Sequence, residues 1–134
     1  MNVLVDTSVW SLALRRPAAH GSAEATELVE LVREGRVAMI GAIRQEILSG
    51  IRVAEQYRKL RDRLRAFGDM DVDESDYEEA ATCFNRCRAR GLQGSNTDFL
   101  LSAVSLRHDL AILTTDKDFV GFARVLGFEL HEPR

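Results

Sequence analysis

The feature that most constrains the fold of this chain is a set of three short runs of β-prone, mostly apolar residues. Each run is followed by a helical pattern. The runs span residues 2–5, 37–40 and 110–114. Because consecutive positions are apolar, the runs are typical of strands buried on both faces. Strands that alternate with helices predict an α/β fold with right-handed crossovers. We therefore expect an α/β chain that forms a three-layer α/β/α sandwich with a mostly parallel central sheet.

The segments between these runs carry helical periodicity and helix-end signals. We expect helices over 8–15, 42–48, 96–107 and 117–126, and a last edge strand over 128–130. Residues 17–21 are expected to form a loop. No linker or internal repeat interrupts the 134 residues, so the prediction is a single domain over 1–134.

Three further helices are predicted together with the face or the cap that defines each. The helix that begins after Ser22 and closes at Gly35 should bury Ala25, Leu28, Val29 and Val32. The helix over 52–67 should bury Val53, Tyr57, Leu60, Leu64 and Phe67. The third helix should open on a capping box of Ser75 and Glu78 and last to about Arg90.

Four acidic residues lie where the structural units should meet one edge of the sheet. Asp6 and Asp116 follow the first and third strands, while Glu46 and Asp98 lie on short amphipathic helices. The carboxyl ends of parallel strands share one edge, and α/β folds bind ligands there. We therefore expect the four carboxylates to converge despite their separation in the sequence.

A converged set of carboxylates requires a counter-charge. Two carboxylates about 4 Å apart repel each other by about 4 kcal/mol at an effective dielectric constant near 20. No histidine or cysteine stands beside these acids, and all-oxygen ligation favours Mg²⁺ or Mn²⁺ over zinc. A cation of this kind can position water and neutralise charge on a phosphoryl oxygen. Phosphodiester hydrolysis is the chemistry that fits best.

Each acid also has a structural alternative. Asp6 and Asp116 can cap the helices that follow them, and Asp118 can stabilise a first helical turn through its charge. Asp98 completes a capping-box pattern that begins at Ser95. Taken one acid at a time, the sequence does not distinguish a structural role at a helix end from a role in binding a metal.

Two of the helical acids have neighbours that bear on the choice. Glu46 flanks a stripe of isoleucines and is therefore expected at the boundary of the core, although a solvated helix position is the alternative. Asp98 shares its helical face with Ser102 and Ser105. Small hydroxyl residues suit a hydrogen-bonded floor of a site, and they equally suit close packing of helices.

Composition narrows the class of protein further. The net charge is −3 and the pI is near 5.6, so the chain has no overall positive field. This argues against a protein that binds DNA tightly and without sequence preference. The first residues lack the pattern of a signal peptide, and no segment approaches the apolar length of a membrane span. Cys83 and Cys87 have no further cysteines to complete a zinc site, so we expect them in the core. The expected location is cytoplasmic.

Four motifs occur in order along nearly the whole chain. They are 2–8 (NVLVDTS), 46–50 (EILSG), 98–106 (DFLLSAVSL) and 113–119 (LTTDKDF). With these motifs the chain resembles the PIN-domain ribonucleases of the VapC toxin type, from type II toxin–antitoxin pairs. Each motif is weak alone, but four in this order are specific.

The resemblance implies a single PIN-like domain and a Mg²⁺-dependent endoribonuclease, with Mn²⁺ as a possible substitute. It implies that Asp6, Glu46, Asp98 and Asp116 bind the metal, with Asp6 and Asp98 the most direct ligands. Asp118 matches the second acid of the last motif and is included among the candidate catalytic residues. Four hydroxyl residues match polar positions near that site: Thr7, Ser8, Thr114 and Thr115. The implied partners are a cognate antitoxin, a second copy in a homodimer, and transfer or ribosomal RNA.

Two arginine clusters have two interpretations. They are Arg58, Lys59, Arg61, Arg63 and Arg65, and then Arg86, Arg88 and Arg90. They form either a solvated, ion-paired face or a basic rim that attracts RNA phosphates. The histidines form no recognisable general-base arrangement.

Two functional alternatives stay open at this point. A DNA-directed or flap-type nuclease can use the same acidic core, although the chain carries no long insertion. A non-catalytic receiver-like signalling module also gathers aspartates at strand ends. The second strand of this chain is followed by Gly41 and Ala42, without the acceptor aspartate that such a module needs.

Overall fold

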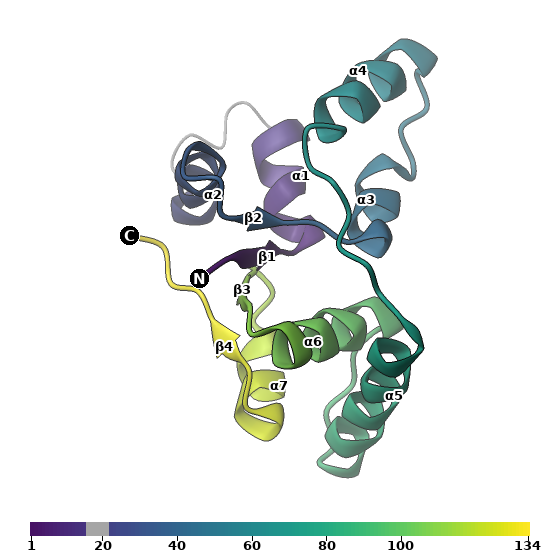
Figure 1. The fold of residues 1–134 in the computed structure, drawn as a ribbon, viewed down its shortest axis with the longest axis vertical. Coiled ribbons are helices and arrows are strands. Elements are labelled where there is room, and N and C mark those ends of the chain that lie inside the picture. The colour runs from purple at the N-terminus through teal and green to yellow at the C-terminus, as the bar shows by residue number, and fades with distance from the viewer. Residues whose placement is uncertain (16–21) are drawn as a thin grey trace.

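In the described part of the chain, the central sheet has four parallel strands in the order β2-β1-β3-β4 (Figure 1). The computed structural model describes residues 1–15 and 22–134, so the expected loop over 17–21 lies outside the described residues. The strands are β1 (Val3–Val5), β2 (Val37–Ala38), β3 (Ala111–Leu113) and β4 (Glu129–Leu130). The predicted α/β class and parallel sheet are confirmed.

Helices cover both faces of this sheet. They are α1 (Thr7–Arg15), α2 (Ala23–Arg33), α3 (Gly41–Leu48), α4 (Ala54–Leu64), α5 (Glu74–Ala89), α6 (Asn96–His108) and α7 (Asp118–Leu126). Helices α1 to α4 follow one another on one side, and α5 to α7 pack together on the other (Figure 1). The three-layer arrangement predicted from the alternation of strands and helices is therefore present.

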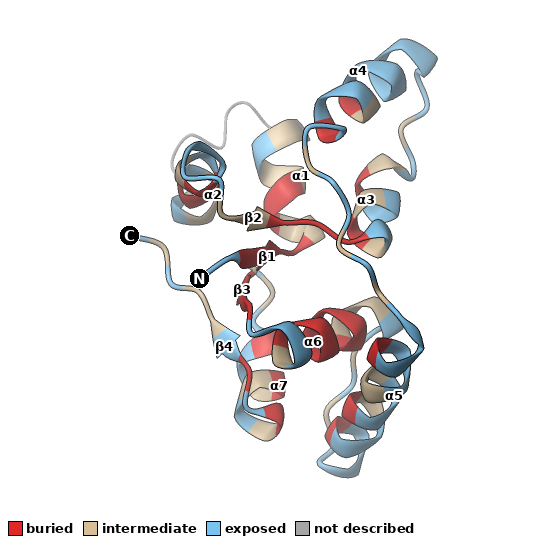
Figure 2. Ribbon diagram, in the orientation of Figure 1, coloured by how far each residue is buried: buried red, intermediate tan, exposed pale blue. Residues whose placement is uncertain are grey.

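Strand β1 is the centre of the core. Val3 is in register with Val37 on one side and with Ala111 on the other, and Val5 is in register with Leu113. Every residue of β1 and β3 is buried, which explains their uninterrupted apolar sequences. Helix α6 is buried without a break from Phe99 to Ser105, and much of its ribbon is red in Figure 2. Cys83 and Cys87 lie in the core, as predicted.

The predicted buried face of α2 is wrong in part. Val29 and Val32 remain 47% and 41% exposed, whereas Glu27, Leu28 and Leu31 are buried. The buried stripe is shifted because Glu27 turns inward to meet His131 and Arg134 near the C-terminus. An apolar pattern cannot predict such a position, because a buried carboxylate is tolerated only with partners that lie far away in the sequence.

The predicted face of the 52–67 helix is also wrong in part. Val53 and Tyr57 are exposed, and only Leu60 and Leu64 of the observed α4 are buried. The helix is shorter than predicted and its first half stands away from the sheet (Figure 1). After it, Arg44 donates to the carbonyl oxygens of Leu64 and Phe67 and fixes the chain that leaves α4.

The cap of α5 is formed by different residues from those predicted. Asp73 is the N-cap, and its carboxylate accepts from the backbone N–H of Asp76 at 3.1 Å. Asp76 in turn accepts from the N–H of Asp73 at 3.0 Å, which completes a capping box. Ser75 and Glu78 therefore lie two residues too late to open the helix.

The buried carboxylate of Glu27 has partners from the C-terminal segment. His131 Nε2 lies 2.5 Å from Glu27 Oε2, and Arg134 Nε donates to Oε1 at 3.1 Å. Burial acts to raise the pKa of Glu27, but the hydrogen bonds from His131 and Arg134 outweigh it and hold the pKa below its ordinary value of 4.5. The contacts join α2 to the chain beyond β4.

A lowered pKa in the folded state makes the ionised Glu27 stabilising above its unfolded pKa. That stabilisation is lost as the pH falls through the folded pKa. We expect Glu27→Gln to lower the free energy of unfolding at pH 7, by an amount that shrinks as the pH drops below about 4.5. Urea unfolding of both proteins across this range measures the difference, with Glu30→Gln on the exposed face of α2 as the control. A difference that stays constant with pH would contradict the assignment.

Candidate active site

The carboxyl ends of β1 and β3 bring two of the predicted acids to one edge. Val5 and Leu113 are neighbours in register, and the backbone N–H of Asp6 donates to Leu113 O at 2.9 Å. Asp6 therefore leaves β1 beside the loop that carries Asp116 out of β3. This arrangement follows from the parallel pairing, which aligns the ends of the two strands.

Asp6 is the most buried of the candidate acids, with 8% of its surface exposed. Its Oδ2 atom accepts from Ser8 Oγ at 3.0 Å and from Thr114 Oγ1 at 2.8 Å. A carboxylate at this depth requires such partners, because an unpaired buried charge is costly. The two hydroxyl groups come from α1 and from the end of β3, so both elements hold the carboxylate.

Glu46 reaches the same edge from α3. Its Oε1 atom accepts from Thr7 Oγ1 at 2.6 Å, which joins α3 to the first residue of α1. Ile43 and Ile47 on the neighbouring face of α3 are buried, while Glu46 itself is exposed. Glu46 is thus next to the buried isoleucines, as expected, but its own position is the solvated one that the sequence left as the alternative.

Asp98 enters from the first turn of α6. Its Oδ2 atom accepts from the backbone N–H of Ser95 at 2.9 Å, and its own N–H donates to Ser95 Oγ at 3.1 Å. This is the capping box expected from the sequence. Gly94 makes the approach possible, because a Cβ atom there would lie 2.8 Å from a ring carbon of Phe122 and 3.1 Å from Asp98 Oδ2.

The loop after β3 places the last two acids differently. Asp116 is partly buried, and its Oδ1 atom accepts from the backbone N–H of Asp118 at 2.9 Å. Asp118 is exposed on the first turn of α7, and within the described chain its carboxylate makes no hydrogen bond or ion pair. The structure thus joins Asp116 to the edge and leaves Asp118 at a helix N-terminus.

Mutual repulsion connects the four acids at this edge. The pKa of Asp6 is raised by burial and by the charge of Glu46, against the lowering effect of its hydrogen bonds. The pKa of Asp98 is raised by burial and by the charges of Asp6 and Asp116. Burial and the neighbouring negative charges therefore disfavour the ionised forms of Asp6 and Asp98, and a bound cation would relieve this.

The donor set suits a small hard cation that keeps some of its water. One carboxylate oxygen of Glu46, of Asp98 and of Asp116 is occupied by a hydrogen bond from the protein. The second oxygen of each has no such bond among the described residues, so each acid can offer one oxygen. Single oxygens fit Mg²⁺ better than Ca²⁺, which takes more ligands and often both oxygens of a carboxylate. In the described chain no three acidic, histidine or cysteine side chains are close enough to hold an ion as they stand.

The two serines that share a face of α6 with Asp98 serve helix packing, which is one of the two roles that the sequence left open. Ser102 and Ser105 are fully buried, and each donates to a main-chain carbonyl oxygen, of Asp98 and Leu110 respectively. They satisfy backbone groups inside the packed helix and do not form the floor of a site. In contrast, the hydroxyl groups of Thr7, Ser8 and Thr114 hydrogen-bond to the acids directly.

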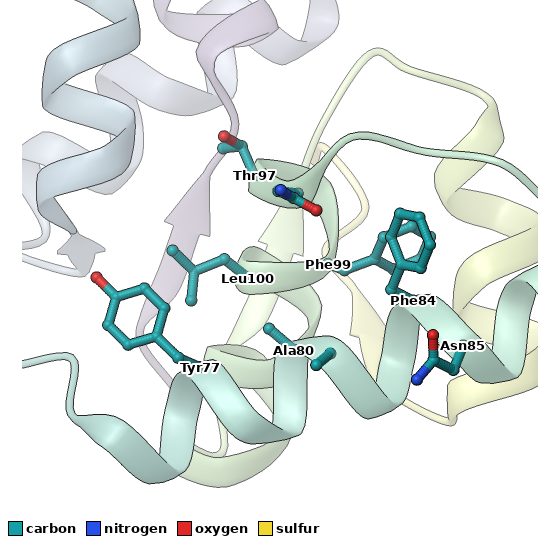
Figure 3. A pocket seen from close by; sticks show the side chains of 9 residues that line it. Tyr77, Ala80, Phe84, Asn85, Thr97, Phe99 and Leu100 are labelled. Atoms are coloured by element: carbon teal, nitrogen blue, oxygen red, sulfur yellow. The ribbon is translucent and has the colours of Figure 1, made fainter.

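A hollow of about 450 Å³ lies between α5 and α6, next to the start of α6 (Figure 3). Its walls are mainly apolar, with Tyr77, Phe84 and Leu100 among the side chains drawn there. Thr97, which precedes Asp98, also faces it. The hollow is formed by different side chains from those at the acidic edge and contains none of the four acids.

The first arginine cluster is largely paired with acids of its own helix. Arg58 and Lys59 contact Glu55, and Arg61 and Arg65 contact Asp62. These side chains are mostly exposed, and exposed pairs of this kind contribute little to stability. The solvated, ion-paired interpretation is therefore the better one for this face.

Comparisons with known proteins place the chain in a family. The family model of the PIN domain matches residues 3–125. The chain is 32% identical over 131 residues to the VapC ribonuclease Mb1587 of Mycobacterium bovis and to the ribonuclease VapC11 of Mycobacterium tuberculosis, covering 95% of this chain and 96% of each relative.

Solved structures share the fold at lower sequence identity. FitAcB from Neisseria gonorrhoeae matches with a TM-score of 0.76 and 20% identity, covering 98% of this chain and 97% of that one. VapBC2 from Rickettsia felis, bound to a DNA fragment from its promoter, matches with a TM-score of 0.77 and 18% identity over 98% of each chain.

The fold and the acidic edge thus define an α/β protein of the PIN-domain class. The chain belongs to the PIN-domain family, and within it to the VapC type. The resemblance predicted from the four motifs is confirmed. No helix in the described part of the chain is long and apolar enough to cross a membrane.

Proposed function

We propose that the chain is a Mg²⁺-dependent endoribonuclease and the toxin of a type II toxin–antitoxin pair. The observation that supports the proposal is the electrostatic repulsion of Asp6 by Glu46 and of Asp98 by Asp6 and Asp116, with Asp6 and Asp116 placed after the paired strands β1 and β3. The ribonuclease names of the relatives at 32% identity support the activity. The substrate is RNA, with transfer or ribosomal RNA as the proposed class, and the proposed location is the cytoplasm.

Each acid has a role in this proposal. Asp6 and Asp98 are the most direct ligands of the cation, because burial and mutual repulsion make them the acids that gain most from a positive charge. When bound, Mg²⁺ supplies positive charge to offset the charge that develops on the phosphoryl oxygens. Glu46 and Asp116 complete the set and orient the attacking water with the carboxylate oxygens that Thr7 and Asp118 leave free. Asp118 contributes negative charge at the rim.

The proposed protein partners are a cognate antitoxin and a second copy of the chain. Solved structures of the same fold include toxin–antitoxin complexes, which supports the first. A homodimer stays a prediction. The exposed side chain of Tyr77 beside the apolar hollow between α5 and α6 is the surface feature that favours it.

Cleavage assays with matched RNA and DNA test the proposal. The full chain is incubated with structured RNA and with DNA of the same sequence, in EDTA and then in Mg²⁺. We expect cleavage of RNA only, and only with the cation present. Cleavage of DNA at a similar rate would favour the alternative of a DNA nuclease on the same acidic core, and cleavage that persists in EDTA would contradict the role of the metal.

A further inference from the structure

Two hydroxyl side chains connect the loop after β3 to the buried carboxylate of Asp6. The backbone N–H of Thr115 donates to Ser8 Oγ at 3.2 Å, and Ser8 Oγ donates to Asp6 Oδ2 at 3.0 Å. The backbone N–H of Asp116 donates to Thr114 Oγ1 at 3.0 Å, and Thr114 Oγ1 donates to the same Oδ2 atom at 2.8 Å. Two parallel chains of hydrogen bonds therefore end on one carboxylate oxygen.

The direction of these hydrogen bonds is fixed by chemistry. A backbone N–H can only donate, so each hydroxyl oxygen accepts from the loop. Each hydroxyl group then has a single hydrogen, which it directs to Asp6. The two hydroxyl oxygens are 3.5 Å apart, too far for a strong bond between them that would take a hydrogen away from Asp6. Each hydroxyl group thus donates its one hydrogen to Asp6 and accepts one hydrogen bond from the loop.

The arrangement couples two acids that are distant in the sequence. Thr114 binds the carboxylate of Asp6 and the main chain of Asp116 with one atom, so the two acids keep a fixed relation across the ends of β1 and β3. Ser8 repeats the coupling from α1 through Thr115. Because Oδ2 accepts from both hydroxyl groups, and the backbone of Thr7 also hydrogen-bonds to this carboxylate, the orientation of the carboxylate is set by residues of both strand ends.

We propose that Ser8 and Thr114 are positioning residues, which set the orientation of the Asp6 carboxylate and of the loop over 114–116 for a divalent cation. The inference rests on the proposed function, because it assumes that Asp6 and Asp116 bind that cation. Side chains that orient metal ligands in this way change metal affinity or activity by about 10- to 100-fold when removed. A simpler role, in which the hydroxyl groups only satisfy loop amides, predicts a loss of stability and no change in affinity.

The test compares Thr114→Val, which removes the hydroxyl group at nearly constant shape, with Thr114→Ser, which keeps it. Ser8→Ala tests the second chain of hydrogen bonds and serves alone if Thr114→Val does not fold. Titration calorimetry of the full chain with Mn²⁺ gives the dissociation constant, and thermal unfolding in EDTA gives the stability. RNA cleavage is then measured at low and at saturating Mn²⁺.

We expect Thr114→Val and Ser8→Ala to raise the dissociation constant for Mn²⁺ by about 10- to 100-fold. Thr114→Ser should restore most of the affinity, and saturating Mn²⁺ should restore most of the cleavage rate in the other two. Unchanged Mn²⁺ affinity in the folded variants, together with saturable binding by the wild type, overturns this inference alone. Absence of saturable binding by the wild type overturns the proposed metal-dependent function and the inference with it.

Discussion

Replacement of Asp6 or Asp98 by asparagine is expected to abolish RNA cleavage and to leave the fold intact. Each substitution removes one negative charge from the acidic edge and keeps an oxygen that can accept the existing hydrogen bonds. In the Asp98 variant, that oxygen can still accept from the N–H of Ser95. Removal of a residue that orients a metal ligand lowers activity by about 10- to 100-fold. Loss of a ligand itself should therefore lower the cleavage rate by at least about 100-fold.

The same variants separate function from folding. Asp6 and Asp98 are pushed toward the neutral form by burial and by neighbouring charges. Removal of the charge should therefore leave thermal stability in EDTA at or above that of the wild type. Asp62→Asn, at an exposed ion pair on α4, is the matched control and should cleave RNA normally. Normal cleavage by both the Asp6 and the Asp98 variants would refute the assignment of the site.

The largest effect on stability is expected from Asp76→Ala. The carboxylate of Asp76 is 1% exposed and accepts from Arg107 Nε at 2.8 Å and from the N–H of Asp73 at 3.0 Å, with His108 Nε2 at 3.1 Å from the same side chain. The substitution removes half of the α5 capping box and leaves the end of α6 without its partner. Breaking a buried ion pair costs about 3 to 5 kcal/mol. Because Arg107 is accessible to water, we expect the free energy of unfolding to fall by about 3 kcal/mol, the lower end of this range.

Urea unfolding at pH 7 measures this loss, and Asp73→Ala provides the comparison. Asp73 supplies only the N-cap, so its loss should cost about 1 kcal/mol. Burial acts to raise the pKa of Asp76, but the N–H of Asp73 and the side chains of Arg107 and His108 outweigh it and lower that pKa. The difference between the wild type and Asp76→Ala should therefore shrink as the pH falls below the ordinary pKa of 3.8. Equal losses in the two variants would show that only the cap matters.

The strands and the acidic edge were predictable because they follow from local pattern and parallel topology. Uninterrupted apolar runs located β1 and β3, and strands that pair in parallel must bring Asp6 and Asp116 together. The capping box of Ser95 and Asp98 was also visible in the sequence, since its members are three residues apart. The single PIN-like domain over 1–134 stays a prediction, because the family match covers residues 3–125.

The errors arose where distant contacts decide the outcome. Glu27 is buried because residues from the C-terminus pair with it, which displaced the predicted apolar face of α2. Among the described residues, none covers Val53, the N-cap of α4, or Tyr57 in its first half, although the periodicity of this segment is that of a buried helix. The hydrogen bonds of Thr7 and Thr114 to the acids could not be predicted from local pattern either, because they join residues 39 and 108 positions apart. The bond from Ser8 to Asp6 is local.

The central claim is that the carboxyl edge of β1 and β3 holds a divalent cation for RNA cleavage. Crystals of the full chain grown with Mn²⁺, measured at a wavelength where manganese scatters anomalously, test it most directly. We predict an anomalous peak within bonding distance of the carboxylates of Asp6 and Asp98, and no such peak in crystals of the Asp98→Asn variant. Ordered Mn²⁺ bound only elsewhere on the chain, at a concentration that supports cleavage, would contradict the account.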